Sequence, residues 1–402
     1  MNLKRVFLNR AFRLFILVLI IFTLIYLSVN LGACEPRKRV IKIGNQAVLS
    51  GENRSFGEEQ LVSIKLAASK LSPVRIGGFD YEIEVVTKDD EGNPEKAFLV
   101  AQEMVDEGVA AVIGSTFNGT TKASLPVYEE YGIPVISPYA QDPEISGMGN
   151  IFFRMVMNNE QKIENIADFI ANKINPQKLM LINNQEEYSI ELVDYLREVL
   201  SDYGIETPEP MSIKISEEDV AVIAENLLIE GPDTIFFCGS YNELASLMTK
   251  AREIGLGSRF ITEKLGMDDK IFDLADAQQY LEGLIAIIPE PPSLARYSQD
   301  YSQDPRAVNF WRDFNNYLSQ MDDSDISIDG PGEYAPYCYD SVFVIIEAMK
   351  RSNSISTKDY IDELKTTSYD GLVGHIEFDS NGDRVNPLST VFIVKDGAWI
   401  RY

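Results

Sequence analysis

Three short segments of this chain are rich in hydroxyl groups and glycine, and each follows a run of β-branched residues. They read LSGENRSFG at 49–57, STFNGTT at 115–121 and SPYAQD at 137–142. Where such a segment precedes a helix, its backbone N–H groups and the helix dipole suit a carboxylate. Taken singly, each segment serves equally well as a helix cap. Three of them meeting at one place would favour an anion-binding site, so the surrounding elements decide the interpretation.

The sequence patterns of common catalytic sites are missing. The chain has no Gly-x-Ser-x-Gly elbow, no P-loop, no Gly-x-Gly-x-x-Gly and no zinc-ligand spacing. Its single histidine, His375, falls in a predicted strand at 373–377, and one histidine cannot build a multi-histidine metal site. We therefore predict a protein that is not an enzyme and that needs neither a metal nor a cofactor.

The elements around the three segments alternate between short β-branched runs and longer amphipathic stretches, which is typical of βαβ units. A first series of strands and helices ends near residue 137, and a second series starts after Pro143. Two series of this size predict two α/β lobes, because a single core this long would be unusual. Ligands of parallel sheets bind beyond the carboxyl ends of the strands, so we expect the site in the cleft between the lobes. The predicted strands are 40–43, 81–86, 110–114, 134–137, 178–182, 234–237 and 283–288, and the predicted helices are 57–70, 94–107, 120–131, 159–174, 188–203, 217–230, 241–254, 305–319 and 333–352, followed by a terminal strand pair.

The first 34 residues resemble a bacterial lipoprotein signal. Four cations precede an apolar run at 14–27, and Leu-Gly-Ala then leads to Cys34. We predict a signal peptide at 1–33, lipid on Cys34 and a tether at 34–40. An uncleaved membrane anchor is the alternative, since the run nearly reaches membrane-spanning length. Both interpretations place the rest of the chain outside the cytoplasmic membrane, in the periplasm or at the cell surface.

The composition is strongly acidic. The formal charge of −26 becomes −30 once the signal and its four cations are removed, and nucleic acid is a poor partner for such a surface. Solubility is the simplest reason for this charge. With Cys34 lipidated, Cys238 and Cys338 are either buried thiols or one disulfide, and their apolar and aromatic flanks favour buried thiols.

Many small motifs occur along the chain from about residue 40 onward. They are Ile43-Gly44, Ser50-Gly51, Phe56-Gly57, Asp89-Asp90, Asn93-Pro94, Val112-Ile113-Gly114, Tyr131-Gly132-Ile133-Pro134, Ile136-Ser137-Pro138, Tyr188, Gly239 with Tyr241, Gly255-Leu256, Glu282-Gly283-Leu284 and Tyr339-Asp340-Ser341. In their order and spacing, the chain is similar to the branched-chain amino acid-binding family of periplasmic substrate-binding proteins. This resemblance implies an α/β protein of the Type I periplasmic-binding fold, with two Rossmann-like lobes, parallel sheets and three crossover segments. We expect lobe I at 41–157 and 290–388, and lobe II at 158–289 and 389–402.

The resemblance also implies which residues bind a ligand. In the family, a hydroxyl and backbone groups hold the ligand carboxylate, an acid of the second lobe binds its ammonium, and aromatic rings cover its side chain. Two positions depart from the pattern, because Asn118 replaces a hydroxyl residue and Gln141 replaces a threonine. The positions carried over are Asn118 and Gly119 in the third strand-to-helix loop (115–121) for the carboxylate, Tyr139 and Gln141 in the fourth loop (137–142), Phe56, Tyr188 and Tyr241 as aromatic walls, and Glu263 as the acid.

The resulting hypothesis is a solute-binding lipoprotein. It would capture a small polar ligand, an amino acid or an amide-like compound, between its lobes and deliver it to an ABC permease. We expect it to act as a monomer. The alternative is a sensor or scaffold lipoprotein that regulates a membrane kinase or an envelope enzyme. An uncleaved anchor would favour this second function, whereas lipid on Cys34 favours the first.

Overall fold

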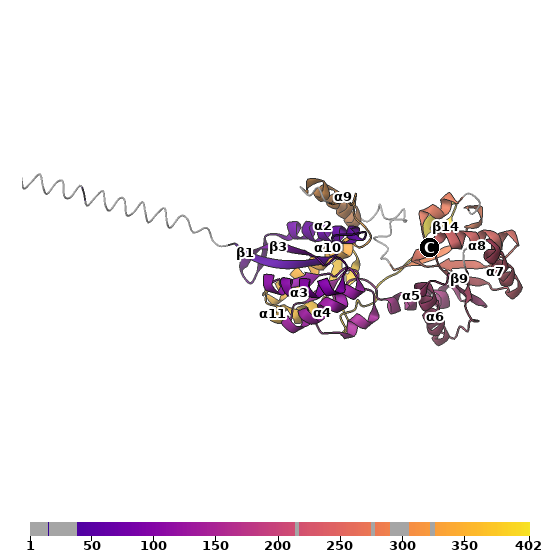
Figure 1. Cartoon of the computed structure of the whole chain (residues 1–402), viewed down its shortest axis with the longest axis horizontal. Helices are drawn as coiled ribbons and strands as arrows, with labels where there is room; N and C mark the ends of the chain where they lie inside the picture. Colours follow the sequence, from indigo (N-terminus) through magenta and orange to yellow (C-terminus); the bar gives the residue numbers. More distant parts are fainter. Residues whose placement is uncertain (1–14, 16–37, 214–216, 275–277, 290–304, 322–325) are drawn as a thin grey trace, which may run out of the picture.

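The computed structural model describes residue 15 and residues 38–213, 217–274, 278–289, 305–321 and 326–402. The predictions for Cys34, the signal and most of the tether lie outside these residues. Two separate α/β lobes follow one another along the molecule (Figure 1). No helix within the described part of the chain has both the length and the apolar character needed to cross a membrane.

The first sheet has six strands in the order β2-β3-β1-β4-β5-β6. Neighbouring strands are parallel, except that β2 and β3 are antiparallel. The sequence predicted four of these strands, but not β2 and β6. The bounds are β1 Arg39–Ala47, β2 Val74–Ile76, β3 Phe79–Asp89, β4 Ala111–Ile113, β5 Val135–Ser137 and β6 Phe152–Arg154.

The second sheet has seven strands in the order β15-β14-β11-β10-β9-β7-β8. The predicted terminal strand pair, β14 and β15, joins this sheet in the antiparallel sense beside β11. Both sheets are therefore mixed at an edge rather than wholly parallel. The bounds are β7 Leu179–Asn183, β8 Met211–Ser212, β9 Thr234–Cys238, β10 Arg259–Thr262, β11 Ile285–Ile288, β14 Thr390–Lys395 and β15 Ala398–Arg401. A separate hairpin pairs β12 Tyr369–Gly371 with β13 Gly374–Ile376.

Helices cover both sheets, and those nearest the C-terminus return to the first one (Figure 1). Lobe I consists of the six-stranded sheet with α2, α3, α4, α9, α10 and α11, and lobe II consists of the seven-stranded sheet with α5, α6, α7 and α8. Helix α11 was not predicted. The bounds are α2 Arg54–Leu71, α3 Pro94–Glu107, α4 Asn118–Tyr131, α5 Asn159–Phe169, α6 Glu187–Asp202, α7 Glu217–Glu230, α8 Tyr241–Glu253, α9 Pro305–Gln320, α10 Ala335–Ser352 and α11 Thr357–Lys365.

Local sequence explains several helix ends. The side chain of Asn93 accepts a hydrogen bond from the Lys96 backbone at the start of α3, Pro94 is the first helical residue, and Gly108 ends the helix in the left-handed conformation. Helix α5 begins with a reciprocal capping box between Asn158 and Gln161. These caps fix where the helices beside the lobe boundary begin.

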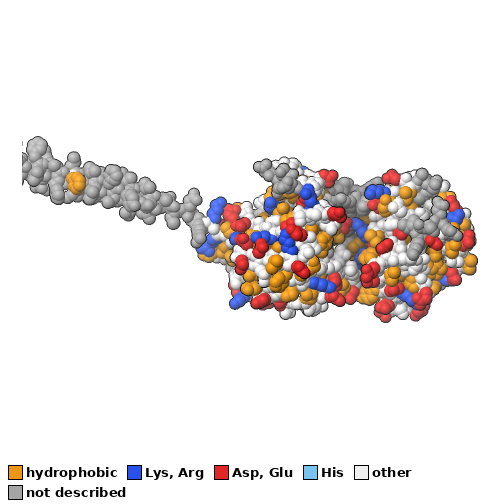
Figure 2. All heavy atoms as spheres, viewed as in Figure 1, with side chains coloured by type: hydrophobic (Ala, Val, Ile, Leu, Met, Phe, Trp, Pro, Cys, Tyr) orange, Lys and Arg blue, Asp and Glu red, His pale blue; other side chains and the backbone are white. Residues whose placement is uncertain are grey.

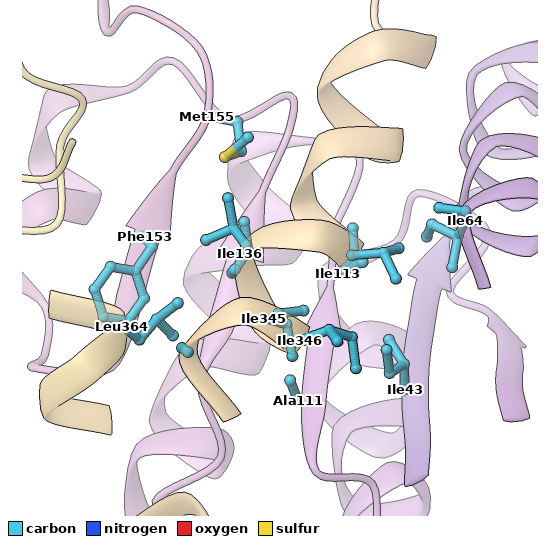
Figure 3. Close-up of a cluster of buried hydrophobic side chains, with 14 of the residues drawn as sticks. Ile43, Ile64, Ala111, Ile113, Ile136, Phe153, Met155, Ile345, Ile346 and Leu364 are labelled. Carbon is cyan, nitrogen blue, oxygen red and sulfur yellow. The ribbon is translucent and has the colours of Figure 1, made fainter. Parts of the chain in front are cut away.

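The core of lobe I lies between the sheet and the C-terminal helices. Ile43, Ile113 and Ile136 project from three adjacent strands toward Ile345 and Ile346 of α10 (Figure 3). All five side chains are buried, so a segment near the end of the chain completes a core that starts near its beginning.

Both remaining cysteines are buried free thiols, as predicted. Cys238 ends β9 in lobe II, whereas Cys338 lies in α10 of lobe I. Burial raises the pKa of each thiol, which makes both poor nucleophiles.

Candidate ligand-binding site

The candidate site is a cavity of about 610 Å³ that both lobes line. Lobe I contributes the start of α4 and the segment after β5, and lobe II contributes the first turns of α5 and α6. Figure 2 shows the surface narrowing between the two lobes, with acidic side chains on each side of the narrow part. The volume is within the range of small-molecule sites. The lining residues are Asn118, Asp142, Pro143, Glu144, Asn159, Glu160, Lys162, Ile163, Tyr188, Glu191, Leu192 and Tyr195.

A second cavity, of about 90 Å³, lies beside the segments that connect the lobes. Lys162 lines both cavities and therefore stands between them. The remaining lining of this smaller cavity combines connecting-segment residues with tyrosines of lobe I: Gln141, Val156, Met157, Lys264, Pro289, Glu333, Tyr334 and Tyr337.

Glu263, the predicted acid of the second lobe, is fully buried and paired with Lys162. The Lys162 ammonium lies 3.1 Å from Glu263 Oε2, contacts the Tyr188 hydroxyl and stands 4.9 Å from the centre of the Tyr188 ring. Burial disfavours its charge, but attraction to Glu263 outweighs burial and raises the pKa of Lys162 above its ordinary value. Two predicted residues, Tyr188 and Glu263, are thus brought together around a lysine that was not predicted.

Asn118 begins α4 and lines the larger cavity. Its side-chain oxygen accepts hydrogen bonds from the backbone N–H groups of Gln141 and Asp142, at 2.9 and 3.3 Å. The third and fourth loops are therefore joined by the residue that departs from the family pattern. A serine or threonine would be shorter, so this bridge depends on the longer amide side chain.

Phe56 and Tyr139 form an aromatic cluster with Tyr334 on the lobe I side. The Tyr139 and Tyr334 ring centres are 4.6 Å apart, and Phe56 meets both rings edge-on. Tyr139 is buried and donates its hydroxyl proton to the Phe56 carbonyl oxygen at 2.8 Å. Gln141 lies at the margin of the cluster, 3.4 Å from the Tyr334 hydroxyl.

Phe56 and Tyr139 do not line either cavity, and neither do the two remaining predicted residues, Gly119 and Tyr241. Gly119 is exposed in the first turn of α4, and Tyr241 begins α8 and packs against the core of lobe II. The structure thus brings Asn118 and Tyr188 to the larger cavity and Gln141 to the smaller one, with Glu263 directly behind Lys162.

An ion pair of Lys264 with Glu333 joins the lobes, at 2.8 Å. Lys264 follows β10 in lobe II, and Glu333 precedes α10 in lobe I. The adjacent residues Glu263 and Lys264 therefore act on different partners, one within lobe II and one across the cleft. Both ions of the Lys264 pair are partly exposed, so its strength should fall as salt is added.

A buried polar cluster centred on Arg154 holds together two segments at the lobe boundary, those containing Asn158 and Asp383. Arg154, at the end of β6, donates to Asp383, to Ser146 and to the carbonyl oxygens of Ala140 and Asp142. Asp383 also accepts from Ser146 and from Asn158, the cap of α5. The cluster thus links the fourth loop to two connecting segments.

Gly382 allows this cluster to form. Its φ is +80°, and a Cβ atom there would stand 1.9 Å from the Phe152 carbonyl oxygen. The Gly382 carbonyl oxygen accepts from the Arg154 backbone at 2.8 Å. Only glycine tolerates this conformation and this close approach.

Sequence reasoning missed Lys162 and Tyr334. Lys162 had a usable signal, because it falls on the same helical face as Ile163, Ile166 and Ile170, which are buried. A cation on an apolar face indicates a buried partner. Tyr334 had no such signal among 19 tyrosines.

A family model described as periplasmic binding protein matches residues 40–398. The chain is 26% identical over 346 residues to an amino acid binding protein of Pseudomonas aeruginosa, covering 85% of this chain and 87% of that one. It is 25% identical over 366 residues to the leucine-specific-binding protein of Salmonella typhimurium, covering 90% and 92%.

Solved structures have the same fold. An ABC transporter substrate-binding protein from Desulfitobacterium hafniense superposes with a TM-score of 0.67 at 20% identity. The superposition covers 90% of this chain and all of that one (100%). The expected Type I arrangement of two α/β lobes is therefore confirmed, with antiparallel strands at the sheet edges.

Proposed function

The chain belongs to the periplasmic binding protein family, and from this premise we propose that it is an extracytoplasmic lipoprotein that binds a small polar solute and delivers it to an ABC permease. The observation that carries the proposal is the cavity of about 610 Å³ lined by both lobes. A solute in contact with two lobes stabilises their closed arrangement, because only there can it touch both. The closed form would then dock on the permease.

The curated relatives are binding proteins, and the chain is a binding protein rather than an enzyme. The titratable residues of the site fit this function. Lys162 and Glu263 satisfy each other, and among the described residues no cluster of histidine, cysteine, aspartate and glutamate could hold a metal ion. The site offers fixed polar groups and aromatic walls, which are means of recognition.

The lipid anchor is the second part of the proposal. The sequence before Cys34 supports it, and so does the extracytoplasmic location that membership of the family implies. A lipid on Cys34, followed by the short tether, would keep the protein near a permease in the same membrane. The solute expected from the sequence, an amino acid or an amide-like compound, stays a prediction.

A thermal-shift screen of the full-length chain in detergent tests solute binding. Amino acids, amides, urea and small carboxylates are the probes, and a solute at 100 times its Kd should stabilise the folded chain by about 2.7 kcal/mol. A dose-dependent shift for one class is the expected result. If no small solute shifts the midpoint of a folded sample, solute capture is the wrong function.

A further inference from the structure

The acid to which the family pattern assigns a ligand ammonium, Glu263, is already paired with an ammonium of the protein itself. Lys162 meets one buried carboxylate, one phenol oxygen and one aromatic face, supplied by Glu263 and Tyr188. An acid and an aromatic ring are also the groups that recognise the ammonium of a small ligand. We call these three residues the lysine cage.

Within the lysine cage, both oxygens of Glu263 already have donors. Oε1 accepts from the Leu265 backbone at 2.9 Å and lies 3.9 Å from the Cys238 sulfur. Oε2 is 3.1 Å from Lys162 and 3.4 Å from the Tyr188 hydroxyl. Glu263 is fully buried, and it is absent from the lining of both cavities between the lobes. A solute in these cavities therefore meets Lys162 and not the acid behind it.

We propose that the solute of this protein carries no ammonium group and presents an oxygen acceptor to Lys162. This inference rests on the proposed solute-binding function and names the chemical class of the solute. Lysine has three N–H donors, of which Glu263 and Tyr188 take two. A carboxylate or carboxamide oxygen can accept the third. An α-ammonium would instead approach a like charge in a partly desolvated site, where repulsion is strong.

Charges at the cavity rim favour the carboxamide over the carboxylate. Glu144, Glu160 and Glu191 line the larger cavity and are exposed, and Asp142 lines it as well. Lys122 pairs with two of these acids, Asp142 and Glu144, at 2.6 Å each. The rim as a whole stays negative, so an uncharged oxygen acceptor meets less repulsion than an anion.

Matched probe sets test this inference by calorimetry on the full-length chain in detergent. Each set contains a carboxamide, its carboxylate and the amino acid of the same carbon skeleton. The sets are propanamide, propanoate and alanine; 4-methylpentanamide, 4-methylpentanoate and leucine; and 3-phenylpropanamide, 3-phenylpropanoate and phenylalanine. Within a set that binds, the tighter of the two ammonium-free compounds should have an affinity at least about tenfold higher than that of the amino acid, which corresponds to 1.4 kcal/mol. We call this quotient of the two affinities the affinity ratio.

The variant Lys162→Met leaves Glu263 without its ion-pair partner, so an amino acid can bind it. The affinity ratio of the ammonium-free compound to the amino acid should therefore fall at least about tenfold. Lys178→Met is the matched control, because Lys178 is an exposed lysine of lobe II that pairs with Glu230 on the surface. It should leave the ratio unchanged. If Lys162→Met does not fold, the double variant Lys162→Met with Glu263→Gln removes both charges, and its ratio should fall close to one.

Three results would overturn the inference while leaving solute binding intact. The wild type could bind an amino acid more tightly than both matched compounds, the ratio could stay unchanged without Lys162, or a solute that carries an ammonium group could bind while none of the nine probes does. If no solute binds at all, the proposed function fails together with the inference.

Discussion

Replacing Arg154 by methionine should destabilise the protein by at least about 3 kcal/mol. Arg154 is fully buried and makes four hydrogen bonds, of which the bond to Asp383 Oδ1 measures 2.8 Å. Methionine fills the volume but leaves the Asp383 carboxylate buried with donors only on its other oxygen, from Ser146 and Asn158. Removing one partner of a buried ion pair costs about 3–5 kcal/mol, because the remaining charge is uncompensated.

Urea unfolding at neutral pH, followed by tryptophan fluorescence and circular dichroism, measures this loss. Arg197→Met is the matched control, since Arg197 pairs with Glu209 through two bonds of 2.8 Å on an exposed surface. The control should lose less than about 1 kcal/mol. Adding Asp383→Asn to Arg154→Met should restore part of the stability, because the buried charge is then gone. Equal losses in Arg154→Met and Arg197→Met would refute the role assigned to the Arg154 cluster.

Three further predictions concern single side chains. Burial raises the pKa of Asp340 to about 7 from an ordinary value near 3.8, so the folded chain holds this proton more tightly than the unfolded chain. The contribution of Asp340 to stability should therefore be greatest below about pH 4, fall by roughly 4 kcal/mol in total as the pH rises to about 7 and level off above it; urea titrations across this range should lack this component in Asp340→Asn. Tyr128→Phe removes the buried 2.6 Å bond that the hydroxyl donates to Gln46 and should cost about 1–2 kcal/mol in urea unfolding, whereas Tyr131→Phe, on the exposed end of α4, should cost almost nothing. Cys34→Ala should move the protein from the membrane fraction to the soluble extracytoplasmic fraction, and its retention in the membrane would favour the uncleaved anchor instead.

The sequence was sufficient for the long, regular elements. Strands β7 and β9 are continuous apolar runs, β3 alternates apolar and charged residues, and α3 and α10 carry clear apolar faces, so these patterns identified them. A strand of three residues is too short to show a period, so β4 and β5 were identified only as short apolar runs, and β2 and β6, each of which contains an arginine, were missed. The antiparallel strand β14 has the same kind of composition as a parallel one, so its direction could not be read from its residues; strand direction depends on the path of the chain between strands.

The site was harder to predict than the fold. Family resemblance pointed to Tyr188 and Glu263, and the structure brings these two residues together. What it could not supply was the partner of the acid, because Lys162 lies on a different helix and the pairing exists only in three dimensions. Tyr139 illustrates the opposite problem, since a tyrosine after a strand can face a cleft or a core with the same local sequence.

The return of the C-terminal segments to both lobes bears on the order in which the protein can fold as it is made. Helices α10 and α11 complete the core of lobe I, and strands β14 and β15 complete the sheet of lobe II. A chain still being synthesised therefore lacks a finished core in either lobe until residues 335–402 have been made. Contacts between such distant segments form slowly. For a chain exported as we propose, this delay would keep it in the unfolded state in which it can be threaded through a membrane.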